Sequence, residues 1–148
     1  MRAVFVSLFL FFVAQPAIAD DDMRFASVDI YLNSTAPVAA WQFELDDRNG
    51  VMQIVGVENG ESGAFERAPY YDREAVQLGN ADRIIVADYS LADESELPSG
   101  RVRIATLHMV LSGTQEPEFD LRLVTAATYD GQVIDASIDL DRPTGSEQ

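Results

Sequence analysis

Cysteine and lysine are both absent from this 148-residue chain, and histidine occurs once, at His108. Without cysteine there is no disulfide framework and no thiolate metal site, so the folded domain must rely on its apolar core alone. A single imidazole cannot form a histidine metal cluster, and no Ser-His-Asp arrangement is visible around it. The alternating residues on either side of His108 instead predict a partly exposed strand residue.

Because lysine is absent, arginine supplies all ten basic residues, against 25 Asp and Glu, and the formal net charge is −15. Such an acidic surface would be repelled by nucleic acids and by anionic membranes, so we expect neither as a partner. Solubility is the simplest explanation for most of this charge.

Long apolar runs are also lacking, since a membrane-spanning helix needs roughly 20 such residues. The longest run, Val4 to Ala14, follows Arg2 and precedes Gln15-Pro16 and the small-residue site Ala17-Ile18-Ala19. This order is typical of a secretory signal peptide. We expect cleavage after Ala19 and a soluble, exported protein, periplasmic or extracellular; an uncleaved N-terminal anchor is the alternative. Loss of Arg2 would make the mature chain one charge more negative.

Alternation of apolar and polar residues is the main pattern in the rest of the chain. Trp41, Phe43 and Leu45 recur at every second position, as in a strand with one buried and one solvated face. Similar patterns predict strands at 28–32, 39–45, 52–58, 75–78, 83–89, 101–111, 119–126 and 133–140, with a long loop at 60–71 and no helix longer than a turn or two.

Short strands separated by turns about every eight to twelve residues are typical of an all-β, antiparallel jelly-roll β-sandwich, here of about eight to nine strands. The expected segments are a leader at 1–19, a short N-terminal segment at 20–24, the sandwich at 25–141 and a disordered tail at 142–148. The predicted core comprises Val28, Ile30, Leu32, Trp41, Phe43, Leu45, Ile54, Val55, Val57, Ile85, Ile104, Leu107, Met109, Leu121, Leu123 and Ile138.

Two local clusters could bind a ligand. Asp46-Asp47 with Asn49 carries the oxygen ligands that calcium favours, although a solvated turn explains these residues equally well. Tyr70-Tyr71 beside Pro69 could stack on a sugar if both rings are exposed, or could anchor the loop. Asn33-Ser34-Thr35 matches a glycosylation acceptor, a motif that is common by chance.

Several segments, in order and spacing, resemble a cohesin-type domain within the wider group of cohesin and cellulose-binding sandwich domains: 41–46 with 51–60, 82–87, 100 with 104–110, and 119–123 before 129–134. Cohesins are nine-stranded jelly-roll sandwiches that bind dockerin modules of secreted enzymes through one flat sheet face, with calcium held in the dockerin. Carried over by position, the resemblance implies that Gln42, Glu44 and Tyr89 lie on this face. Ala40 and Gln42 replace the Asn and Asp that dockerin-binding cohesins usually present, which removes a charged anchor.

We therefore predict a non-enzymatic recognition domain that binds another protein, a dockerin-bearing one under the resemblance, through Gln42, Glu44 and Tyr89. We expect no cofactor and no metal on this chain, and any calcium would arrive with the partner. The alternative is a carbohydrate-binding module for polysaccharide that uses Tyr70 and Tyr71. A glycoside-type hydrolase is a third hypothesis, for which nothing marks out two paired carboxylates.

Overall fold

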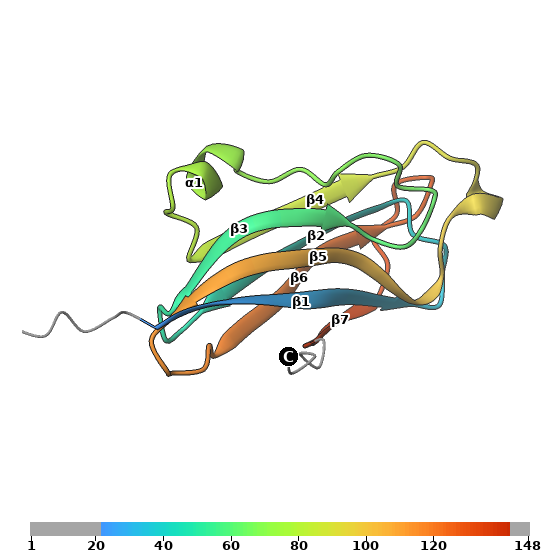
Figure 1. Cartoon of the computed structure of the whole chain (residues 1–148). Helices are drawn as coiled ribbons and strands as arrows, with labels where there is room; N and C mark the ends of the chain where they lie inside the picture. Colours follow the sequence, from blue (N-terminus) through green and yellow to red (C-terminus); the bar gives the residue numbers. More distant parts are fainter. Residues whose placement is uncertain (1–21, 143–148) are drawn as a thin grey trace, which may run out of the picture.

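Two antiparallel sheets packed face to face make up the computed structural model, which describes residues 22–142 (Figure 1). One sheet has the order β3 (Met52–Asn59), β5 (Gly100–Ser112), β1 (Met23–Ser34), β7 (Ala136–Asp141). The other has the order β4 (Arg83–Tyr89), β2 (Ala40–Asp47), β6 (Phe119–Ala127). The all-β antiparallel sandwich is confirmed. The leader at 1–19 with its cleavage site, and the tail from residue 143, lie outside the described residues.

Alternate residues of β1 and β2 form the centre of the core. Trp41, Phe43 and Leu45 of β2 are buried, and so are their neighbours Ile30 and Leu32 of β1. The indole of Trp41 stacks on Phe43, with ring centroids 5.7 Å apart. Each large side chain buried here stabilises the fold by about 1.5–3 kcal/mol relative to its exposed state. Between residues 22 and 142, no helix is long and apolar enough to cross a membrane.

Two residues predicted in the core are exposed instead. Val55 is 41% exposed because it follows the buried Ile54 in the alternation of β3, and the register shift between Ile54 and Gly56 turns Val57 back toward the core. Ile85 is 45% exposed, in a run of three apolar residues whose first and last members face inward. The other predicted core residues are buried or pack against the core from partly buried positions, the latter being Val57, Leu121, Leu123 and Ile138.

The predicted strand at 75–78 is a short helix, α1 (Arg73–Gln77). Asp72 caps it, since its Oδ1 accepts a hydrogen bond from the backbone N–H of Ala75 at 2.9 Å. The described residues contain seven strands rather than eight or nine, because 75–78 is helical and Tyr70 in the 60–71 loop pairs with Ala87 only as a single bridge. The predicted bounds of β4 agree with the structure in full.

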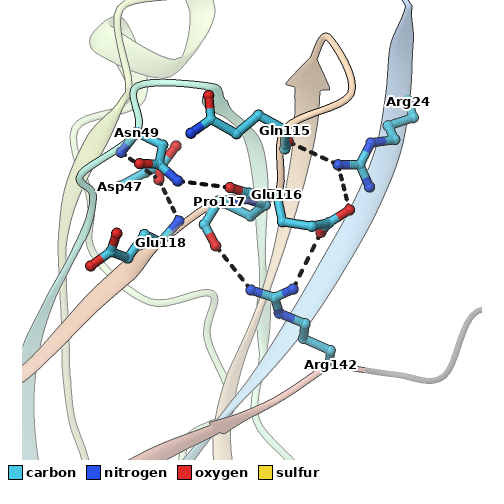
Figure 2. A network of polar contacts seen from close by, with 8 residues as sticks. All are labelled: Arg24, Asp47, Asn49, Gln115, Glu116, Pro117, Glu118 and Arg142. Atoms are coloured by element: carbon cyan, nitrogen blue, oxygen red, sulfur yellow. Dashed lines mark hydrogen bonds and ion pairs between the residues drawn. The ribbon is translucent and has the colours of Figure 1, made fainter.

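Asp47 organises one end of the sandwich (Figure 2). Its Oδ1 accepts the backbone N–H groups of Asn49 and Glu118, and its Oδ2 accepts those of Val51 and Met52, at distances of 2.8–3.1 Å. The residue is buried. Its carboxylate therefore closes the β2–β3 turn and holds the start of β6 beside it. These oxygens are occupied by backbone donors, so the cluster is a turn.

The loop between β5 and β6 is tied to the same end through Glu116. Its carboxylate forms ion pairs with Arg24 at 2.8 Å and Arg142 at 3.3 Å, and its carbonyl accepts the side-chain amide of Asn49 at 2.9 Å. Arg142 also donates to the Pro117 carbonyl (Figure 2). Exposed ion pairs contribute little singly, but this network joins β1, β7 and the β2–β3 turn. It lies at the end of β2 and the start of β6.

Candidate binding face

The outer surface of the β4–β2–β6 sheet gathers the residues that the sequence assigned to partner binding. We call this surface the β2 face; it comprises Ala40, Gln42, Glu44 and Asp46 of β2, Arg83, Ile85, Ala87 and Tyr89 of β4, Asp120, Arg122 and Thr125 of β6, and Tyr70 with Arg67 at the β4 edge. Tyr70 joins β4 through reciprocal backbone hydrogen bonds with Ala87 of 2.8 and 3.0 Å. The sheet is thereby widened by one residue at this edge.

A stacked aromatic cluster lies at that edge. The rings of Tyr70 and Tyr89 are nearly parallel, at 6° with centroids 6.0 Å apart, and the two residues are 50% and 43% exposed. The guanidinium carbon of Arg67 lies 5.3 Å from the Tyr89 centroid and 5.9 Å from that of Tyr70, within the range of cation–π attraction. Arg67 lowers the pKa of Tyr89, whereas the Tyr89 hydroxyl raises the pKa of Tyr70. The cluster is a partly preordered apolar surface with polar tips.

The structure thus combines two residues that the sequence placed in rival hypotheses. Tyr89 was assigned to protein binding and Tyr70 to sugar binding, yet their rings stack on each other. Tyr71 instead packs against the core, and Arg73 lies 4.9 Å from its ring centroid. The sequence did not indicate Arg67, because no local pattern shows that this loop residue lies beside Tyr89 at the end of β4.

Glu44 has a different environment from the solvated one expected at its position. Its carboxylate hydrogen-bonds to the side chains of Arg83 and Arg122, one from each neighbouring strand. Only 11% of the side chain remains exposed. The hydrogen bond from Arg83, followed by that from Arg122, lowers the pKa of Glu44. Glu44 therefore orients two arginines on the face, while Gln42 beside it is half-buried.

Glu44→Gln should reduce thermal stability more at neutral pH than in acid. A lowered folded-state pKa means that Glu44 stabilises the fold above its unfolded pKa, and that this contribution disappears as the pH falls through the folded value. We expect the Tm of the variant to lie slightly below that of wild type at pH 7, and the gap to be smaller at pH 3, as followed by circular dichroism. The exposed Glu94→Gln variant is the control. An equal difference at both pH values would contradict the charge-based explanation.

His108 is partly exposed on the outer surface of the other sheet, as predicted. Its Nε2 lies 3.1 Å from Glu58 Oε1. The two groups form an ion pair only when the imidazole is protonated, and their geometry does not meet that of a hydrogen bond. Within residues 22–142 no three His, Asp or Glu side chains are placed to hold a metal ion.

Comparison with known proteins adds information on the fold. No protein-family model matches the chain, and no curated protein matches it significantly. Among solved structures, it is similar to a chain of the Coh-OlpA-Doc918 type I cohesin–dockerin complex from Clostridium thermocellum, with a TM-score of 0.56, 12% identity and coverage of 76% of this chain and 82% of that one. It is also similar to the seventh ScaB type I cohesin from Pseudobacteroides cellulosolvens, with a TM-score of 0.51, 13% identity and coverage of 74% and 73%. The predicted cohesin-type fold is confirmed, and at these identities the likeness concerns the fold alone.

Proposed function

We propose that this cohesin-type domain is a non-catalytic, exported recognition module that binds another protein through the β2 face. The Arg67–Tyr70–Tyr89 cluster is the observation that carries the proposal. Tyrosine and arginine are enriched among the residues that dominate binding energy at interfaces, and rigid rings lose little conformational entropy on binding. Ile85, exposed on the same strand as Tyr89, extends the apolar area across the face.

The charges of the face indicate the chemistry of the partner. Arg83 and Arg122 are engaged by Glu44, whereas within the described part of the chain no carboxylate lies within ion-pair distance of Arg67. In so acidic a protein, a guanidinium beside exposed aromatic rings suits a partner that offers a carboxylate next to an apolar side chain. A dockerin-bearing protein is our specific candidate, supported by the fold and by the solved cohesin–dockerin complex that shares it.

Tyr89→Ala should weaken partner binding at least tenfold, because it removes the ring that contacts both Tyr70 and Arg67. The mature domain would be used to capture exported proteins of the source organism with and without calcium, and the captured protein would then be purified and titrated by calorimetry. Tyr129→Ala is the matched control, since Tyr129 is exposed outside the β2 face. Calcium-dependent capture of a protein with paired calcium loops would support the dockerin assignment. Equal affinities of the two variants would exclude the β2 face.

A carbohydrate-binding function is the second candidate, and the parallel, half-exposed rings of Tyr70 and Tyr89 favour it. The platform would then consist of these two rings rather than the Tyr70–Tyr71 doublet. Gln42→Ala separates the two functions, because it should weaken protein binding and leave sugar binding unchanged. Affinity electrophoresis in gels containing soluble polysaccharides measures sugar binding. Unretarded migration of the wild-type domain would rule out the carbohydrate-binding function.

A further inference from the structure

An open hollow of about 690 Å³ lies beside the β2 face, between residues 63–67 and residues 88–92. Its polar lining consists of Glu66, Arg67, Asp88, Tyr89, Ser90 and Glu96. Three carboxylates and one guanidinium leave two net negative charges when all are ionised. The hollow therefore attracts cations more strongly than anions.

Asp88 is the unusual member of this lining. It occupies an inward position near the end of β4 and is 5% exposed. Its Oδ1 accepts the backbone N–H of Tyr89 at 2.8 Å, but its Oδ2 has no hydrogen-bond partner in the described part of the chain. Burial raises the pKa of Asp88. A buried carboxylate oxygen without a donor destabilises a fold, so the position of this group needs an explanation.

The missing donor points to a particular chemical group. A guanidinium binds a carboxylate best through two oxygens at once, and Oδ1 of Asp88 is already occupied by the Tyr89 N–H. An ammonium group is a compact charge that can satisfy one oxygen. The nearby Tyr89 ring adds a surface that attracts cations, and Leu91 offers an apolar wall for a methylene stem.

We propose that the hollow binds an alkylammonium group, which donates to Asp88 Oδ2 while its methylene stem lies along Leu91 and Tyr89. Because Oδ2 is covered by its surroundings, the ligand must displace part of the wall, in which Gly63 has no side chain and Ala64 and Ala92 carry only a methyl group. The group can belong to a lysine side chain of a protein or to a free polyamine. The hollow shares Arg67 and Tyr89 with the β2 face, but amine binding at Asp88 does not require that the face binds a protein.

A structural alternative involves Trp41, which lies opposite Asp88 in the register of β2 and β4 and whose Nε1 also has no partner among the described residues. If the only role of Asp88 were to accept a hydrogen bond from this indole, substituting Asp88 would change the stability of the fold and the hollow would bind no amine. The two explanations predict different results in a titration.

The test is a titration of the ¹⁵N-labelled mature domain with three probes, followed by the backbone amide shifts of Tyr89 and Ser90. The probes are Nα-acetyl-lysine methylamide, Nα-acetyl-norleucine methylamide, which lacks the terminal ammonium group and is uncharged, and 1,5-diaminopentane. We expect saturable shifts with one or both amines and none with norleucine. Stronger binding of the lysine probe would indicate a protein ligand, and stronger binding of the diamine would indicate a free polyamine. Identical shifts with lysine and norleucine would overturn the proposal.

Variants then assign the binding to the carboxylate. Asp88→Asn should weaken amine binding at least tenfold while leaving Tm unchanged or higher, because it removes an unpartnered buried charge. Glu96→Gln, at an exposed lining position, should weaken binding about threefold without affecting the buried strand. Glu94→Gln removes an equal charge close by, outside the hollow, and should have no effect. Unchanged affinity in both Asp88→Asn and Glu96→Gln would refute the site.

Discussion

Asp47→Ala is expected to lower the free energy of unfolding by about 3 kcal/mol, because it deprives four backbone N–H groups of their acceptor. The N–H of Met52 is buried and cannot turn to water without opening the end of the sandwich. For a domain of this size the loss corresponds to roughly 10 °C in Tm. Urea unfolding followed by the fluorescence of Trp41, the single tryptophan, measures it directly.

Two further variants show whether the acceptors are responsible. Asp47→Asn keeps one oxygen and so can retain two of the four hydrogen bonds, which predicts about half the destabilisation. Asp46→Ala, at the neighbouring outward position, should change stability by no more than about 0.5 kcal/mol. A loss below about 1 kcal/mol in Asp47→Ala would show that water replaces the carboxylate and that this corner does not hold β2 and β6 in place.

Gly60→Ala is expected to destabilise the domain by about 3 kcal/mol for a steric reason. A Cβ at this position would lie 2.2 Å from the Arg103 carbonyl oxygen and 2.7 Å from Ile104 Cα. Both are backbone atoms of β5, a central strand that pairs with β1 and β3, so neither can move aside at low cost. The chain after β3 would have to leave β5, and with it the hydrogen bond from the Glu61 N–H to the Arg103 carbonyl. Thermal unfolding monitored by circular dichroism measures this loss of stability.

Gly63→Ala provides the matched control in the same segment. Nothing lies within 4 Å of a Cβ built there, and Gly63 does not have a left-handed backbone conformation. The substitution should be neutral or slightly stabilising, because alanine reduces the entropy of the unfolded chain. Since residues 60–70 carry Arg67 and Tyr70 to the β2 face, Gly60→Ala should also weaken binding there. Equal stability of the two variants would mean that this segment is free to shift on β5.

The fold follows from local patterns to a large extent. Trp41, Phe43 and Leu45 alternate with less apolar residues, and this periodicity is enough to place β2 and its buried side. The turn residues between strands set the approximate bounds of most elements. Prediction failed where the local pattern is ambiguous, as at Ile85, whose apolar neighbours on both sides hide the phase of the strand. It also failed at 75–78, where the short segment Ala-Val-Gln-Leu is compatible with either a strand or a helix capped by Asp72.

The candidate sites follow from the sequence only in part. Gln42 and Tyr89 lie on one sheet face, as the resemblance implied, and their binding role stays a prediction. Tyr70 was identified as a candidate for a different function, and Arg67 and Asp88 were not identified at all. No residue-level pattern shows that a buried carboxylate lacks a donor, because this depends on every atom packed around it.

The sequence by itself therefore determined the class of structure: an acidic, cysteine-free antiparallel sandwich with Trp41 in its core. Only the tertiary structure decided the chemistry of its surfaces, since it pairs Glu44 with Arg83, 39 positions away, and with Arg122, 78 positions away. The physical reason is that alternation is a property of neighbouring residues, readable along the chain. Register and sheet order instead arise from the packing of the whole core, and they decide which distant side chains meet.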